Sequence, residues 1–165
     1  MDKIYNYDHY LSLNIDFSKI VNSTLDLIPG SILCIDNDDV DKLDNFISEA
    51  LKKNVDKILT NSKSKISNEK VYRFEDYEKV FEDILYNINP AYKEKIYFGI
   101  TGTNGKTTTA YLLNSLLGDS SIFVGTIDEY NLFQFTKEEH LTTPKLFNLV
   151  KMLSLVDSNI KNVVL

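Results

Sequence analysis

The chain has 165 residues, enough to bury a substantial hydrophobic core in one domain or in two small ones. Its net charge of −6 excludes a broad electrostatic surface for nucleic acid, so phosphate binding must come from a local site. The single cysteine, Cys34, excludes an intramolecular disulfide, and its apolar neighbours favour burial over a role as nucleophile. With neither a signal peptide nor an apolar run of transmembrane length, we expect a soluble cytoplasmic protein that binds no membrane.

Residues 1–88 are predicted to form a small α/β domain. Pro29-Gly30 indicates a turn, and the apolar residues 31–35 after it are typical of a short strand. The acidic turn 36–39 lacks the glycine and terminal glutamate of a calcium loop, so we expect it to cap a helix. Apolar residues at helical spacing place that helix over 40–53.

A second strand and a second helix are expected in the same domain. Residues 55–60 favour the strand, and the polar residues 60–70 favour an exposed connection. From Phe74 to Ile88, large apolar side chains recur three and four residues apart. This spacing predicts a helix packed on the sheet.

The domain boundary is predicted within residues 87–95, which contain Pro90, so a second domain covers 89–165. It opens with an apolar strand candidate over 96–100 that leads into a glycine-rich loop. A helical apolar pattern over 110–117 follows the loop. Strand, glycine loop and helix in this order are typical of a phosphate-binding site.

The chemistry of this loop fits a nucleotide. Its glycines allow tight turns that bring backbone N–H groups close to anionic oxygens. The lysine would reach the terminal phosphates, and the threonine after it would bind Mg²⁺. The strict motif has a glycine where this chain has Ile100. We predict that ATP binds the phosphate loop, with Lys106 catalytic and Thr107 a Mg²⁺ ligand; the loop comprises Gly102, Thr103, Asn104, Gly105, Lys106, Thr107, Thr108 and Thr109.

The rest of the second domain is expected to extend a mostly parallel sheet. Residues 121–126 predict a strand, and a strand-helix-strand unit implies a parallel crossover. Pro144 suits the first position of a helix, with Thr143 as its cap. Residues 160–165 begin another buried strand.

Three stretches resemble the Mur ligases, which build the peptide of bacterial cell-wall precursors. Residues 101–109 resemble their ATP loop, and Leu141-Thr142-Thr143-Pro144 resembles the stretch that holds the UDP-sugar peptide in the branch adding the third peptide residue. Asn22-Ser23-Thr24 is similar to a motif of that branch in which an acid and an arginine flank the serine. The resemblance implies that Ser23, Thr142 and Thr143 contact the UDP-muramoyl peptide.

The resemblance further implies a UDP-binding α/β domain followed by the start of a P-loop ATPase domain. The expected reaction joins UDP-N-acetylmuramoyl-L-alanyl-D-glutamate to a diamino acid, meso-diaminopimelate or lysine, through an acyl phosphate. Because the family's usual architecture continues beyond the equivalent of Leu165, we expect an incomplete fragment that is inactive alone. Two alternatives stay open: another P-loop enzyme such as a folylpolyglutamate-type ligase, or a non-catalytic module that binds nucleotide or UDP-sugar.

Overall fold

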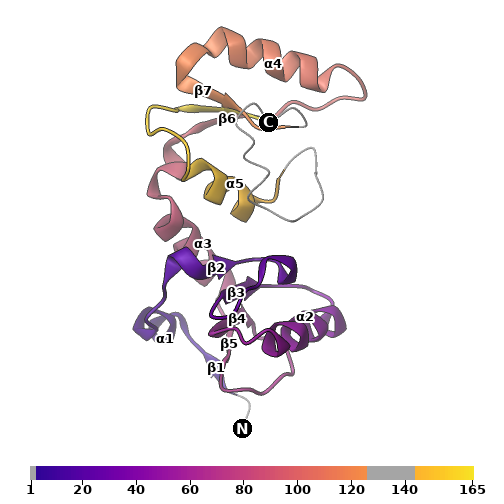
Figure 1. Cartoon of the computed structure of the whole chain (residues 1–165), viewed down its shortest axis with the longest axis vertical. Helices are drawn as coiled ribbons and strands as arrows, with labels where there is room; N and C mark the ends of the chain where they lie inside the picture. Colours follow the sequence, from indigo (N-terminus) through magenta and orange to yellow (C-terminus); the bar gives the residue numbers. More distant parts are fainter. Residues whose placement is uncertain (1–2, 126–143) are drawn as a thin grey trace. The chain divides into compact units, whose positions relative to one another are not determined.

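The computed structural model describes residues 3–125 and 144–165 of the chain. The chain divides into two compact units, Met1–Asn87 and Ile88–Leu165 (Figure 1). Each unit is built on its own parallel sheet, which confirms the predicted α/β class. No helix within the described ranges is both long and apolar enough to cross a membrane.

The first unit contains a five-stranded sheet in which all neighbouring strands are parallel. The predicted strands at 31–35 and 55–60 are confirmed as two of the longer, inner strands. The two edge strands have two residues each, too few to show alternation in the sequence. In sheet order the strands are β1 (Ile4–Tyr5), β5 (Val71–Phe74), β4 (Lys57–Asn61), β3 (Ile32–Ile35) and β2 (Ile20–Val21).

Most helical elements of the first unit begin at a short polar side chain that caps them. The Asp39 carboxylate accepts the Lys42 N–H at 3.2 Å and starts α2, as predicted for the acidic turn. Asn6 accepts the His9 N–H at 3.0 Å and starts α1. The helical elements are α1 (Tyr7–Ser12), η1 (Phe17–Lys19), η2 (Thr24–Asp26), α2 (Val40–Lys52) and α3 (Tyr77–Ile88).

The two longest helices of this unit pack on opposite faces of its sheet. Leu43 and Ile47 of α2 pack against Leu33 of β3 in one buried cluster. Cys34, the next residue of β3, faces the other way, and its Sγ lies 3.0 Å from the Tyr77 hydroxyl of α3. Burial raises the pKa of the Cys34 thiol to about 12, so it stays protonated at neutral pH. The predicted burial of Cys34 is confirmed.

One prediction for residues 60–88 is wrong, and the exposed connection predicted over 60–70 is confirmed only in part. Phe74 is the last residue of β5, paired with Tyr5 and Asn61, and the helix begins only at Tyr77. Its apolar side chain continues the helical spacing by coincidence, because a strand residue facing the core is equally apolar. Ser64, in the expected exposed connection, is 2% exposed, and its hydroxyl donates to the Asp44 carboxylate at 2.7 Å.

The second unit has a three-stranded parallel sheet. The last strand in sequence pairs with both others and lies between them, an order that connectivity alone does not reveal. The predicted strands and the helix after the glycine loop are confirmed, and each strand is two or three residues shorter than predicted. The elements are η3 (Pro90–Glu94), β6 (Ile96–Phe98), α4 (Lys106–Leu117), η4 (Gly118–Ser120), β7 (Ser121–Phe123), α5 (Leu146–Leu153) and β8 (Asn162–Val164).

Helices α4 and α5 cover opposite faces of this second sheet (Figure 1). Phe123 and Val164 pack with Ala110 of α4. Their strand neighbours Ile122 and Val163 pack with the α5 side chains. The period of two along each strand thus produces a helix-sheet-helix sandwich, and both crossovers start at the carboxyl ends of strands.

The start of α5 differs from the prediction. Lys145 is the N-cap residue, with an extended ψ of 151°, so Pro144 lies outside the helix instead of at its first position. The Lys145 carbonyl accepts the Leu149 N–H at 2.9 Å and closes the first turn without a side-chain cap. Thr143, the predicted cap, lies outside the described residues.

Candidate functional site

The phosphate loop joins the carboxyl end of β6 to the first turn of α4. The Ile100 N–H donates to the Leu165 carbonyl at 2.8 Å, which ties the start of the loop to the end of β8. Gly102 and Gly105 have φ of 153° and 77°, which L side chains rarely adopt. The loop therefore requires glycine at these two positions for backbone reasons alone.

The first turn of α4 presents unpaired backbone donors. Gly105 is its N-cap, so no side chain caps the helix, and the first intrahelical bond runs from the Thr109 N–H to the Gly105 carbonyl at 2.9 Å. The N–H groups of residues 106–108 therefore lack an intrahelical acceptor. Together with the positive end of the helix dipole, these N–H groups form a site for an anion.

Lys106, the first residue of α4, folds back over the loop. Its ammonium donates to the Gly102 carbonyl at 2.7 Å, which places a positive charge beside the helix N-terminus. Thr107 follows in the same turn, so its hydroxyl belongs to the same part of the loop. A cluster of N–H donors, one ammonium and one hydroxyl fits a phosphate group with a bound Mg²⁺ ion.

All eight residues predicted to bind ATP therefore lie in one continuous structure, residues 102–105 in the turn and 106–109 in the helix. Ser23 lies in the other unit, where it caps η2 by accepting the Leu25 N–H at 3.3 Å. Thr142 and Thr143, the other predicted substrate contacts, lie outside the described residues.

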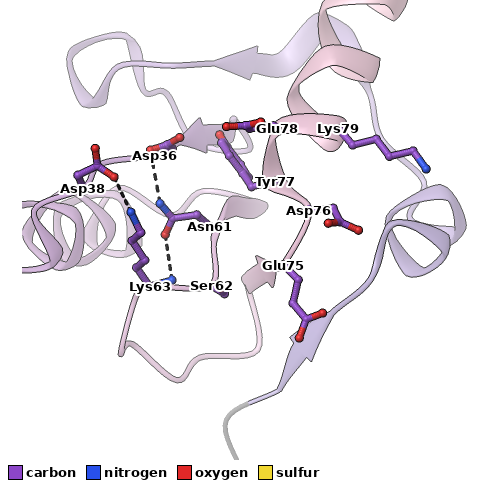
Figure 2. Close-up of a pocket in the computed structure, with 10 residues that line it drawn as sticks. All are labelled: Asp36, Asp38, Asn61, Ser62, Lys63, Glu75, Asp76, Tyr77, Glu78 and Lys79. Atoms are coloured by element: carbon purple, nitrogen blue, oxygen red, sulfur yellow. Dashed lines mark hydrogen bonds and ion pairs between the residues drawn. The ribbon is translucent and has the colours of Figure 1, made fainter.

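The first unit has a pocket at the carboxyl edge of its sheet, called here the strand-end pocket (Figure 2). Its volume is about 530 Å³, and side chains following β3, β4 and β5 line it. Carboxylates outnumber ammonium groups in the lining, so the pocket is electronegative. The lining residues are Asp36, Asp38, Asn61, Ser62, Lys63, Glu75, Asp76, Tyr77, Glu78 and Lys79.

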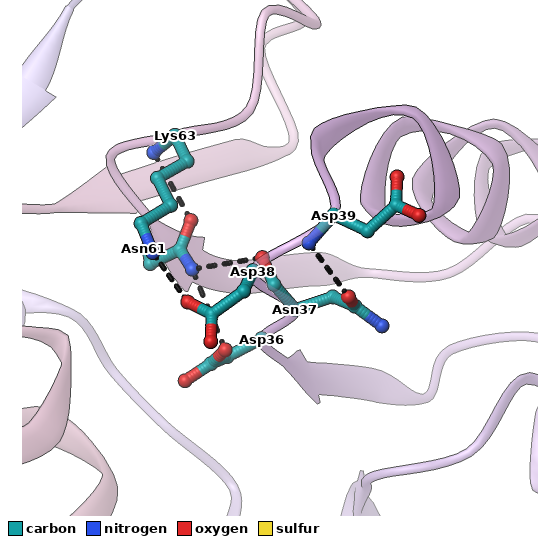
Figure 3. A network of polar contacts seen from close by, with 6 residues as sticks. All are labelled: Asp36, Asn37, Asp38, Asp39, Asn61 and Lys63. Carbon is teal, nitrogen blue, oxygen red and sulfur yellow. Dashed lines mark hydrogen bonds and ion pairs between the residues drawn. The ribbon is translucent and has the colours of Figure 1, made fainter.

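Polar contacts across the strand ends shape one wall of this pocket (Figure 3). The Lys63 ammonium pairs with Asp38, and this contact lowers the pKa of the Asp38 carboxyl and raises that of Lys63. The Asn61 amide donates to Asp36 at 3.4 Å, and its oxygen accepts the Lys63 N–H at 3.0 Å. Side chains from the ends of β3 and β4 thus hold each other.

No contiguous motif in the sequence marks this pocket. Its residues lie in three separate segments, and only the sheet order brings them to one edge. The usable signal was the run of polar residues directly after each parallel strand, because ligands gather at that edge in such sheets.

Comparison with known proteins relates both units to one family. Residues 100–165 match the family model described as Mur ligase middle domain. The chain is 36% identical over 148 residues to a Clostridium acetobutylicum protein named UDP-N-acetylmuramoyl-L-alanyl-D-glutamate--2,6-diaminopimelate ligase 1, covering 87% of this chain and 29% of that protein. A Fusobacterium nucleatum protein named UDP-N-acetylmuramoyl-L-alanyl-D-glutamate--2,6-diaminopimelate ligase is 34% identical over 112 residues. This match covers 66% of this chain and 23% of the Fusobacterium protein.

Two solved structures share the fold. The MurF ligase from Thermotoga maritima in complex with ADP gives a TM-score of 0.51 at 16% identity, covering 91% of this chain and 32% of that one. MurF from Acinetobacter baumannii gives a TM-score of 0.52 at 15% sequence identity, and the match covers 93% of this chain and 30% of that one. The chain thus spans less than a third of the length of these relatives.

Proposed function

We propose that this chain, whose residues 100–165 belong to the Mur ligase family, is part of an ATP-dependent ligase of peptidoglycan biosynthesis. The proposed reaction adds a diamino acid to UDP-N-acetylmuramoyl-L-alanyl-D-glutamate. The observation that carries the proposal is the phosphate loop, in which glycines of positive φ precede Lys106 and a helix with free N–H donors. The relatives' names support 2,6-diaminopimelate as the diamino acid.

The phosphate loop would hold the β- and γ-phosphates of ATP. When bound with Mg²⁺, ATP would supply the phosphoryl group that activates the glutamate side-chain carboxylate for attack by the incoming amine. The N–H groups of residues 106–108 would hold phosphate oxygens, and Thr107 would bind Mg²⁺. Lys106 would exchange its bond to the Gly102 carbonyl for a phosphate oxygen and stabilise charge that develops during transfer.

The first unit would bind the UDP end of the other substrate, with Ser23 as one contact. Thr142 and Thr143, in the segment before α5, would contact the same substrate through their hydroxyls. Both substrates are nucleotides of the cell interior, so we propose a cytoplasmic protein. In this scheme the chain acts by binding, positioning and charge stabilisation, and none of its residues is assigned as a general base.

ADP release dependent on the UDP-muramoyl dipeptide tests this proposal in the complete gene product. Lys106→Ala should abolish it, whereas Lys161→Ala, an exposed lysine before β8 in the same unit, should leave it unchanged. Substrate-dependent ADP release that survives Lys106→Ala would contradict the proposal. ATP binding without any ADP release from the unsubstituted protein would instead favour the non-catalytic module.

A further inference from the structure

We propose that Glu49 and Lys53, at the carboxyl end of α2, position the Ser23 loop (residues 22–25) for binding the UDP-linked substrate. This inference rests on the proposed function, because it takes Ser23 as a substrate contact. It adds two positioning residues, which act through the loop without touching the substrate.

The Ser23 loop is held only weakly by its own hydrogen bonds. The Ser23 hydroxyl accepts the Leu25 N–H at 3.3 Å, and the Ser23 carbonyl accepts the Asp26 N–H at 3.3 Å. Both distances exceed the usual N–H···O separation of about 2.9–3.0 Å. None of residues 22–25 is charged, so the loop cannot form an ion pair of its own.

Contacts from α2 supply the missing support. The Lys53 ammonium donates to the Thr24 carbonyl at 2.7 Å, a short charge-assisted bond directly after Ser23. The same ammonium pairs with the Glu49 carboxylate at 3.1 Å. Hydrogen bonds from Lys53 and from the Thr24 hydroxyl lower the pKa of Glu49, so the carboxylate holds both partners. Thr24 is 7% exposed, whereas the side chains of Lys53 and Glu49 are 38% and 45% exposed, so a water-accessible ion pair holds a buried loop residue.

Lys53 is itself fixed at its backbone. It is the C-cap of α2, and its N–H donates to the Ala50 carbonyl at 3.0 Å. The next residue, Asn54, has a φ of 54°, and its carbonyl accepts the Gly30 N–H at 3.1 Å. A positive charge here is also favoured by the negative end of the helix dipole. The ammonium therefore reaches Thr24 from an anchored point.

This arrangement matters for the Ser23 hydroxyl. Its oxygen already accepts the Leu25 N–H, and no hydrogen bond among the described residues uses its O–H, which can donate to a substrate oxygen. The direction of that donor depends on the loop backbone, and displacement of a contact by about 1 Å strongly reduces its effect. Loss of the Lys53 contact should therefore weaken binding of the UDP ligand while sparing the ATP site.

The test measures two dissociation constants in the complete gene product by calorimetry, one for UDP-N-acetylmuramoyl-L-alanyl-D-glutamate and one for ATP. Lys53→Met should raise the first about tenfold and leave the second unchanged. Lys53→Arg, which keeps the charge and the donors, should restore most of the affinity. Lys42→Met is the matched control, because Lys42 lies on the same helix and pairs with Asp39 at 3.4 Å.

A double substitution tests whether Lys53 acts through Ser23. In a Ser23→Ala background, Lys53→Met should add little, because the contact it positions is already gone. Full additivity, or an unchanged constant for the UDP ligand in Lys53→Met, would overturn the positioning role alone. Failure of the unsubstituted protein to bind the UDP ligand would overturn the proposed function as well.

Discussion

The phosphate loop and the strand-end pocket both lie at the carboxyl ends of parallel strands, but they are built from different parts of the chain. The phosphate loop is made chiefly of backbone, with two glycines and the N–H groups of one helix turn. The strand-end pocket is made of side chains that follow three different strands. A site formed by the backbone can occupy a few consecutive residues, whereas a site formed by side chains is dispersed along the chain.

The two sites also differ in charge. The helix N-terminus and Lys106 make the phosphate loop electropositive, and the carboxylates make the strand-end pocket electronegative. A diphosphate is therefore favoured at the first site and repelled by the second. This difference predicts that substitutions that strain the backbone have the largest effect at the phosphate loop. Substitution of a single charged side chain should have only a small effect at the strand-end pocket.

Gly105→Ala should have the largest effect on ligand binding. An alanine at φ 77° is strained, and relief of that strain displaces N–H donors from the phosphates. Loss of one charge-assisted hydrogen bond should weaken ATP binding roughly 10- to 100-fold, measured by calorimetry.

Gly118→Ala is the matched control for that substitution. Gly118, at the other end of α4, has a φ of 68° and, like Gly105, open space where the Cβ of an alanine would lie. Gly105→Ala should lower stability by about 1–2 kcal/mol. Gly118→Ala should cost at least as much, because its ψ of −155° lies in a region essentially restricted to glycine. Only Gly105→Ala should change the affinity for ATP. Equal losses of affinity would show that helix stability, and not loop geometry, controls nucleotide binding.

Cys34→Ala should have the next largest effect, and in the first unit. It removes the partner of the buried Tyr77 hydroxyl at 3.0 Å and leaves that group unsatisfied. The expected loss is about 1–3 kcal/mol in the free energy of unfolding, measured by denaturant titration. Cys34→Ser keeps a hydrogen-bonding partner and should lose less; an equal loss for both variants would show that only packed volume matters here.

The sequence predicted the phosphate loop and its flanking strand and helix because chemistry and local structure coincide over a few residues. The helix at 40–53 could be predicted for a similar reason, because Asp39 marks the start of α2 and the apolar spacing marks its buried face. Strands β1 and β2 have only two residues each, so they show no alternation of apolar and polar residues. The apolar side chain of Phe74 is compatible with both a strand and a helix, so the pattern did not show where β5 ends. The strand-end pocket could not be predicted without the sheet order.

The position of β8 between β6 and β7 also could not be predicted from local sequence patterns. A strand-helix-strand unit predicts parallel strands, but it leaves open whether another strand lies between them. Here the hydrogen bonds from Ile100 and Val124 to β8 and the residue after it decide the order. These contacts join residues far apart in the sequence, so no short pattern records them.

Asp39→Ala should lower the melting temperature by a few degrees, because α2 loses its N-terminal cap. The Lys42 N–H is the main cause of the lowered pKa of Asp39. A lowered carboxyl pKa stabilises the fold above its unfolded value of about 3.9, and the stabilisation disappears as the pH falls through the folded value. Wild type and variant should therefore converge in melting temperature at the acidic end; a constant difference would exclude the charged cap.

The smallest effect is expected from the exposed Asp38–Lys63 pair beside the strand-end pocket. Asp38→Asn should shift the melting temperature by less than about 2 °C, and added salt should reduce the shift further. The hydrogen bond to Lys63 lowers the pKa of Asp38, and the same bond raises that of Lys63. The ion pair therefore stabilises the fold at pH values between the unfolded pKa of Asp38 and the unfolded pKa of Lys63. This stabilisation is lost when the pH falls through the folded pKa of Asp38 or rises through the folded pKa of Lys63. A large, salt-independent shift would mean that side-chain charge holds the pocket as firmly as backbone geometry holds the phosphate loop.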